Sequence, residues 1–158
     1  MSIDFDDSGP KLSEQKLSKF ETKIAYRLPE DYRKFMLRHN GGTPVMEMMF
    51  SFQESGKNSD SVIDSFYAIA VEADVTTISE AVETYIVSGR IPSSLLPIAD
   101  DQFGNQLCID VSGETRGAVY FWNHERESSV HDTSLVFPLS LISGSFDHFL
   151  GLLVPVEE

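Results

Sequence analysis

Three short apolar segments separated by turn residues place the strongest constraint on how this chain folds. They cover residues 96–99, 106–111 and 117–122, and the connections between them are rich in Asp, Gly and Asn. Connections this short join antiparallel neighbours, because a parallel pair needs a crossover of about a dozen residues or more. The sequence therefore predicts a meander of three antiparallel strands in the second half of the chain.

Four other segments have apolar residues spaced by three and four positions, which is the pattern of an amphipathic helix. Ser13 is placed to cap the first, Pro29 opens the second, and Thr77 with Glu80 forms a capping box before the third. Gly41 follows the second segment and can end it in a left-handed conformation. We expect helices over residues 14–25, 29–39, 78–85 and 146–153.

The remaining apolar segments predict further strands. Alternation favours one over residues 45–52, and others are expected over 62–70 and 135–138, with a polar loop over 53–61. These elements predict an α+β fold with a mainly antiparallel sheet of about five to six strands flanked by helices. The length suits one domain, so we expect a single domain over residues 1–158, with residues 1–10 as a flexible tail.

Acidic side chains outnumber basic ones, and the excess lies after residue 38. The formal net charge is −13, with 8 Lys and Arg against 7 Asp and Glu in residues 1–38, and 4 against 18 in the remainder. Such a surface repels phosphate groups, so we expect no direct binding of nucleic acid or of an anionic membrane. It attracts a cationic protein, and charge steering raises association rates by about 10- to 1000-fold at low salt.

The apolar runs of the sequence are far shorter than the roughly 20 residues that cross a bilayer. The first residues are acidic, whereas a secretory signal begins with a basic region. We therefore expect a cytoplasmic protein. Cys108, the single cysteine, lies in the apolar segment 106–111, which predicts a packed thiol without an internal disulfide.

Asp100, Asp101, Asp110 and His124 are the strongest candidates for a metal or acid–base site. Adjacent residues of a strand point to opposite faces, so Asp100 and Asp101 converge only where a turn distorts the strand. The segment 100–105 is too short for a calcium loop, the histidines lack the spacing of a zinc helix, and no serine lies in a nucleophile elbow. We therefore interpret these acidic residues as turn-forming residues on a solvated acidic surface. We expect no catalytic residue, no metal and no other cofactor.

Three groups of residues resemble the SUKH superfamily, which is named in part for yeast regulators of cell-wall synthesis and includes many bacterial immunity proteins. They are the helix entry Leu28–Pro29, the turn Asn40–Gly41–Gly42, and the region 100–125. Gln102 stands where relatives often have proline or glycine, and Asn123 where aspartate is common. The resemblance implies a SUKH-like α+β domain with structural roles for Leu28, Pro29, Tyr32, Phe35, Gly41, Gly42, Gly104, Asp110, Gly117, Val119, Tyr120 and Trp122.

The resemblance also implies a protein that binds another protein, which for bacterial members is a cognate toxin, often a nuclease. It supplies no shared catalytic residues and no universal binding site. Together with the acidic charge, it leads to the hypothesis of an immunity protein that neutralises a basic toxin by mimicking the charge of nucleic acid. The candidate contacts are Asp100, Asp101, Asp110, Glu125 and Glu127. Two alternatives stay open: a regulatory scaffold like the fungal relatives, and a metal-assisted enzyme that uses Asp100, Asp101 and His124.

Overall fold

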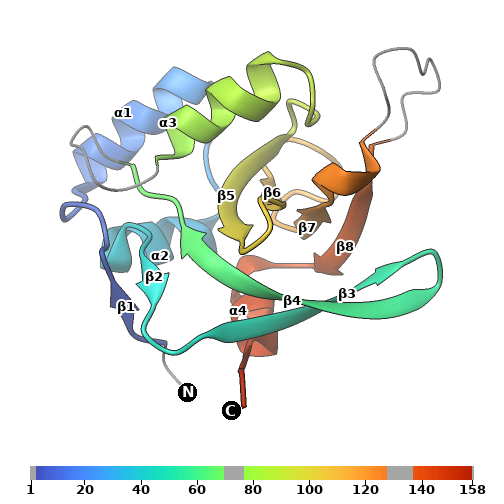
Figure 1. Cartoon of the computed structure of the whole chain (residues 1–158). Coiled ribbons are helices and arrows are strands. Elements are labelled where there is room, and N and C mark those ends of the chain that lie inside the picture. The colour runs from blue at the N-terminus through green and yellow to red at the C-terminus, as the bar shows by residue number, and fades with distance from the viewer. Residues whose placement is uncertain (1–2, 70–76, 128–136, 158) are drawn as a thin grey trace.

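A strongly curved antiparallel sheet forms the framework of the computed structural model, which describes residues 3–69, 77–127 and 137–157 (Figure 1). Within these ranges seven strands lie in the order β8-β7-β6-β5-β4-β3-β9, and β1 pairs separately with β2. The predicted α+β fold and antiparallel meander are confirmed, with more strands than expected. The strands are β1 (Phe5–Asp6), β2 (Thr43–Pro44), β3 (Met48–Glu54), β4 (Lys57–Phe66), β5 (Leu95–Asp101), β6 (Gln106–Asp110), β7 (Val119–Trp122), β8 (Leu139–Ser143) and β9 (Val154–Pro155).

Three helices begin directly after a serine or threonine cap, whereas α2 begins at Glu30, with Pro29 as its N-cap rather than its predicted first residue. The side chains of Ser13, Thr77 and Ser145 each accept a hydrogen bond from the backbone N–H three residues later, at 3.1–3.2 Å. In the described ranges, no helix combines the length and apolar character needed to cross a membrane. The helices are α1 (Glu14–Ile24), α2 (Glu30–His39), α3 (Ile78–Ala81) with a π-helical continuation (Val82–Val87), and α4 (Phe146–Leu152), and a short 3-10 turn covers His124–Arg126.

Strand β6 is buried along its whole length, and its side chains alternate between two apolar clusters. Leu107 and Ile109 join the larger cluster, which contains the buried faces of α1, α2 and α4. Cys108 packs with Trp122 in the smaller cluster, against the π-helical continuation of α3. The Cys108 thiol is wholly buried and outside any disulfide, which confirms the prediction of a packed thiol.

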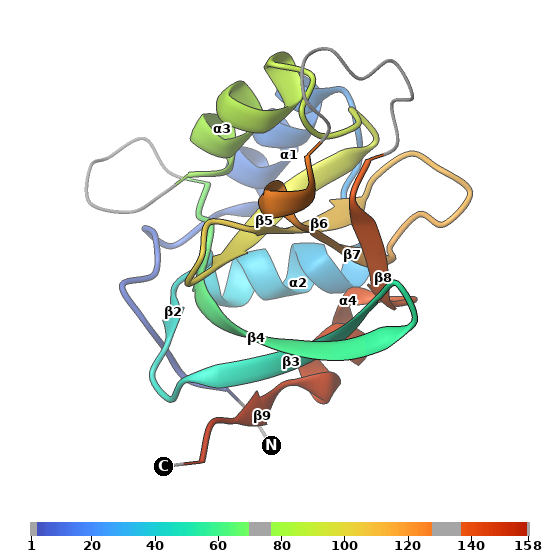
Figure 2. The ribbon, with the colours of Figure 1, turned by 45° about the vertical axis from the view of Figure 1, so that its right-hand side comes forward.

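The sheet curls until the β3–β4 hairpin faces β7. A register shift between Ile63 and Ser65 interrupts the pairing of β4 with β5, and such irregularities bend a strand. In the view of Figure 2, the hairpin passes below the meander. The rings of Phe52 and Phe121 meet with centroids 4.2 Å apart, so β3 and β7 are in contact although they are distant in the sheet order.

The prediction of a polar loop over residues 53–61 is wrong, because this segment is the outer part of the β3–β4 hairpin. The strands are joined by Ser55 and Gly56, whose φ angles are 51° and 77°. Positive φ at both central residues is what a type I′ turn requires, and this turn matches the twist of paired strands. Apolar alternation stops at Phe52, but pairing continues through polar residues as far as Glu54 and Lys57.

Other predicted boundaries are displaced as well. Strand β3 begins at Met48, which leaves Val45 and Met46 outside it and more than half exposed. Of the strand predicted over 135–138, residues 135 and 136 lie outside the described residues, and the strand in this region begins later, at Leu139. The helix predicted over 78–85 is a single α-helical turn followed by the π-helical continuation.

Asn40 ends α2 and joins two distant segments. Its Nδ2 donates to the carbonyl oxygens of Pro10 and Ile69 at 2.8 and 2.9 Å, and its Oδ1 accepts from the Ile69 N–H at 2.8 Å. The next residue, Gly41, has φ 75°, and a Cβ there would lie 2.6 Å from the carbonyl oxygen of Tyr67. The turn therefore needs glycine for both its conformation and its close packing.

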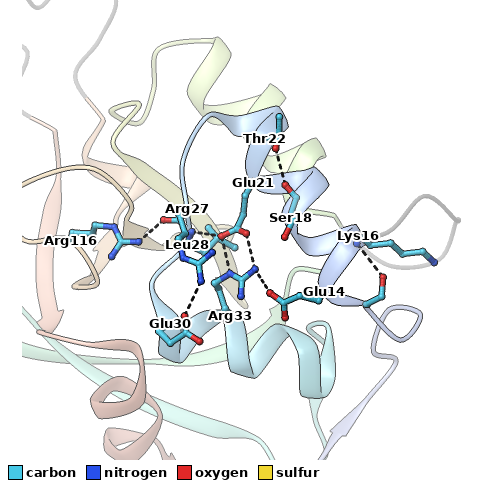
Figure 3. Close-up of polar contacts among 11 residues, drawn as sticks. Glu14, Lys16, Ser18, Glu21, Thr22, Arg27, Leu28, Glu30, Arg33 and Arg116 are labelled. Carbon is cyan, nitrogen blue, oxygen red and sulfur yellow. Dashed lines mark hydrogen bonds and ion pairs between the residues drawn. The ribbon is translucent and has the colours of Figure 1, made fainter.

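A buried ionic network joins α1 to α2 (Figure 3). Arg33 is 2% exposed and binds Glu21 through Nε and Nη2 at 3.0 and 2.9 Å, while its Nη2 also lies 2.6 Å from Glu14. The Leu28 N–H donates to Glu21 at 2.7 Å. Burial raises the pKa of Glu21, but the bonds and charge of Arg33 and the Leu28 N–H outweigh burial and hold this pKa below its ordinary value.

Candidate functional site

Asp101 ends β5 and organises the turn into β6. Its Oδ1 accepts the backbone N–H groups of Phe103 and Asn105, each at 2.9 Å. Its Oδ2 accepts the Ser61 hydroxyl at 2.7 Å and the Asn105 amide at 2.8 Å. This carboxylate is 3% exposed and receives four hydrogen bonds, so it braces the turn against β4.

His124 holds the other side of the same turn. Its backbone N–H donates to Asn105 Oδ1 at 3.0 Å, and its ring Nε2 lies 2.7 Å from the carbonyl oxygen of Phe103. A carbonyl only accepts hydrogen bonds, so Nε2 carries the proton. Both backbone polar groups of Phe103 are therefore bonded, whereas its side chain is 67% exposed.

Asp110 has the equivalent role in the turn between β6 and β7. Its carboxylate accepts the N–H groups of Ser112 and Gly113 at 3.0 and 2.7 Å and the Thr115 hydroxyl at 2.6 Å. Burial raises the pKa of Asp110, but these hydrogen bonds outweigh burial and hold the pKa below its ordinary value. Asp110 is 4% exposed and is likewise an internal brace.

Asp100 makes contacts separate from those of its neighbour Asp101. It accepts from the backbone N–H and the hydroxyl of Ser65 at 3.1 and 3.2 Å. Partial burial, together with the nearby charge of Asp64, raises the pKa of Asp100 to about 6. Asp100 therefore has its own partner, whereas Asp101 and His124 both bond to Phe103 and Asn105 and hold the same turn from two sides. In residues 3–69, 77–127 and 137–157, no three His, Cys, Asp or Glu side chains are grouped as metal ligands.

The two predicted glutamate contacts differ in their surroundings. Glu127 binds Arg90 through both carboxylate oxygens, at 3.1 and 2.6 Å. The Arg90 guanidinium lies over the rings of Tyr85 and Trp122, 4.9 and 5.3 Å from their centroids. Glu125 is exposed, and its backbone N–H is held by Asn123 Oδ1 at 3.0 Å.

The five residues predicted as partner contacts therefore do not form a single site in the structure. Asp101 and Asp110 are buried braces, Glu127 is engaged by Arg90, and Asp100 is partly buried. Glu125 presents its carboxylate to solvent. Of these residues, Asp101 and Glu125 line the same cavity.

This cavity, which we call the acidic groove, has a volume of about 250 Å³ and lies where the β3–β4 hairpin crosses the meander. Phe52, Phe121, Asn105 and Asn123 are buried in it, whereas the exposed residues are Asp60, Phe103 and Glu125. In the part of the chain that the structure describes, no basic residue lines it. The full lining is Phe52, Asp60, Ser61, Asp101, Phe103, Asn105, Phe121, Asn123 and Glu125.

A second cavity of about 440 Å³ lies between α1 and the π-helical continuation of α3. Figure 1 and Figure 2 show α1 and α3 side by side. The lining of this cavity is mostly apolar, and Lys23 and Glu83 give it charges of both signs. It lacks the single sign of charge that distinguishes the acidic groove.

The sequence did not identify Asp60 or Phe103 as site residues. Asp60 falls in the segment predicted as a loop, and Phe103 lies in the segment 100–105, which the sequence favours only as a turn. The dipeptide Ser55–Gly56 is a recognised turn signal and could have located the hairpin that carries Asp60.

Comparisons with known proteins agree with this fold. The model of the SMI1 / KNR4 family (SUKH-1) matches residues 11–151, a range that contains α1 to β8 and every residue of the acidic groove. The chain is also similar to the SPbeta prophage-derived uncharacterized protein YokK of Bacillus subtilis (strain 168). The two are 29% identical over 159 residues, which cover 90% of this chain and 76% of the relative. Because the family match spans most of the sequence, the chain belongs to the SMI1 / KNR4 family (SUKH-1).

Proposed function

We propose that this protein is a non-catalytic, cytoplasmic immunity protein that binds and neutralises a cognate protein toxin. The observation that carries the proposal is membership in SUKH-1, a family known for immunity proteins. The similarity to a prophage-derived protein supports it, because a mobile element is a setting in which protective proteins are carried.

The internal roles of the acidic residues support a binding function over a catalytic one. Asp101 and Asp110 receive hydrogen bonds that use their oxygens within the fold. The His124 ring donates to a backbone carbonyl, and Asp100 contacts Ser65. General acid–base catalysis requires such groups to converge on one reacting atom, whereas Asp101 and His124 are bonded to the Phe103–Asn105 turn and Asp100 to Ser65.

The charge of the chain indicates a basic partner. A net charge of −13 attracts a cationic protein over a distance set by ionic strength, about 10 Å at 0.1 M salt. Nuclease toxins need basic surfaces to bind phosphate groups, so an anionic protein can compete for the same surface.

A co-expression experiment tests the immunity function. The product of the gene adjacent to this one is the candidate toxin, and cells that express it should survive when this protein is present and die when it is absent. A non-cognate toxin of the same reaction class is the specificity control, since this protein should give no protection from it. Cell death despite a folded, abundant protein and direct contact with the toxin would refute the proposal.

The salt dependence of association tests the charge component separately. We expect the association rate with the purified toxin to fall by about tenfold or more between roughly 50 and 500 mM NaCl, because screening removes long-range attraction. Stopped-flow fluorescence measures this rate. An association rate that does not change with salt would contradict charge mimicry, while the proposed immunity function would still stand.

A further inference from the structure

The larger cavity, of about 440 Å³, lies on a face of the molecule where α1 and α3 are side by side (Figure 1). We call it the helical groove. Its lining includes the buried apolar residues Leu95, Leu96 and Val111, with Phe20 from α1 and Ile86 from the π-helical continuation of α3. A cavity of this volume and apolar character accommodates several apolar side chains of a partner.

The α1 wall of the helical groove is cationic. Lys23 lines the cavity, and Lys16 and Lys19 precede it by seven and four residues, which places all three on one face of the helix. All three side chains are exposed. Within residues 3–69, 77–127 and 137–157, none of them makes an ion pair.

The opposite wall is anionic. Glu83 lines the cavity from the π-helical continuation, Glu80 lies about one turn before it, and both are exposed. Lys23 and Glu83 line the same cavity, yet in the described part of the chain they are not paired with each other or with another residue. The fold therefore leaves opposite charges on the two walls of one apolar groove.

This arrangement of charges is self-complementary. A two-fold axis that runs along the groove sets the α1 wall of one copy against the α3 wall of the other, so lysines meet glutamates on both sides. The apolar linings of the two copies then meet between these contacts. A partner with a single sign of charge would be attracted by one wall and repelled by the other. A second copy of this chain is therefore the partner that the charges favour.

We propose that two copies of this protein associate through the helical groove, with Lys23 of each copy beside Glu83 of the other. Tyr26, an exposed aromatic residue of the lining, becomes buried in this contact. The net charge of −13 opposes self-association, so we expect a weak dimer, with a dissociation constant on the order of 10–100 μM. The inference goes beyond the proposed function and does not depend on it.

Sedimentation equilibrium of the purified full chain tests whether the dimer forms. Between about 5 and 500 μM protein, in about 0.15 M NaCl, the weight-average mass should rise from that of the monomer toward twice that value. The mass of a monomer throughout this range would overturn the inference.

Charge reversal tests whether the helical groove is the contact. Lys23→Glu and Glu83→Lys each place like charges opposite one another twice in every dimer, so each should raise the dissociation constant about tenfold or more. Lys34→Glu and Glu114→Lys make the same changes in net charge at exposed positions outside the groove lining, and are the matched controls. We expect the controls to change the dissociation constant by less than about threefold. Equal effects of groove and control variants would show that net charge, and not this face, governs association.

A mixture of the two groove variants is the strictest test. Lys23→Glu protein should bind Glu83→Lys protein within about threefold of the wild-type affinity, because every contact again joins opposite charges and the total charge equals that of the wild-type dimer. Circular dichroism establishes that each variant is folded. A mixture that associates no better than either variant alone would show that the assigned face is wrong. Both experiments use this protein alone, so their outcome is independent of whether it protects cells from a toxin.

Discussion

Single charged residues in this protein mainly support its backbone. Arg33 and Glu21 join two helices in the buried network of Figure 3, and Asp101 and Asp110 each hold a turn of the meander. A buried charge is tolerated only when it is paired and fully hydrogen-bonded. Removal of one member of such a set should therefore cost far more than removal of an exposed charge.

Arg33→Leu should lower the free energy of unfolding by about 3–5 kcal/mol at pH 7, because it leaves the buried Glu21 carboxylate without its cation. Arg27→Leu is the control: its pair with Glu30 is more than half exposed at 3.4 Å and should contribute less than about 1 kcal/mol. Urea unfolding followed by fluorescence measures both. Similar losses in the two variants would contradict the assigned role of the network.

The loss in free energy of unfolding caused by Arg33→Leu should become smaller at acidic pH. The pKa of Glu21 is lowered in the folded protein, so its stabilising contribution is present above the unfolded pKa of about 4.5 and is lost as pH falls through the folded pKa. Without Arg33, burial instead raises this pKa, and the variant gains relative stability as the carboxyl takes up a proton. Unfolding measured from pH 7 to pH 4 should show the two curves converging.

Asp100→Asn should stabilise the protein at pH 7. The pKa of Asp100 is about 6 in the folded state against an ordinary 3.8, so its favourable contribution is complete below pH 3.8 and is lost as pH rises through 6. Asparagine keeps an acceptor for the Ser65 N–H and removes the repulsion from Asp64. We expect a gain of about 1 kcal/mol after allowance for partial exposure, absent at pH 4. Urea unfolding at the two pH values measures it, and an equal difference at both would contradict the titration.

Among the elements, the β3–β4 hairpin does most to shape the acidic groove. Its strands supply Phe52, Asp60 and Ser61 to the lining. Their placement depends on the two-residue turn at Ser55–Gly56 and on the register shift in β4. The hairpin and the Asn40–Gly41 turn both use glycine at positive φ, but in different surroundings.

Two glycine substitutions separate backbone strain from crowding. Gly56→Ala should cost about 1–2 kcal/mol, because φ is 77° and no atom lies within 4 Å of the added Cβ. Gly41→Ala has a similar φ of 75°, but its Cβ would also meet the Tyr67 and Phe66 carbonyl oxygens at 2.6 and 2.7 Å. We expect a loss of about 3 kcal/mol or more at that position. Thermal unfolding compares the two, and equal losses would show that crowding at Gly41 is relieved cheaply.

The sequence predicts those elements whose signals are local. Ser13 and Thr77 cap their helices as expected, and the meander pairs as its short turns require. The π-helical continuation Val82–Val87 escapes prediction because its apolar spacing resembles that of an α-helix. The strand pairing beyond Phe52 could not be predicted, because polar residues on an exposed hairpin have no alternating apolar pattern.

The acidic groove could not be predicted because it depends on contacts between distant segments. Asp101 is braced by Ser61, 40 residues away in the chain, and Phe52 reaches Phe121 only because the sheet curls. The sequence shows that Asp101 and Glu125 are acidic, but their spacing does not predict that they line the same groove as Asp60 and Phe103. The proposal of a basic partner comes from the charge, whereas the position of any contact requires the fold.

At the scale of the whole molecule, the net charge of −13 has opposite effects on folding and on association. Like charges repel one another in the folded state, so added salt should stabilise the fold. We expect about 1 kcal/mol of stabilisation between roughly 20 and 200 mM NaCl, while the rate of association with the proposed toxin falls. Urea unfolding at several salt concentrations measures the first effect. A fold that loses stability with added salt would show that attractive ion pairs dominate.

The turns of the meander are anchored from within, by Asp101 and Asp110, while side chains such as Phe103 and Glu114 face outward. Substitution on the outside leaves the anchoring carboxylates and their donors in place. If the protein neutralises a toxin as proposed, exchange of a few exterior residues can change the toxin that it recognises while the architecture is kept.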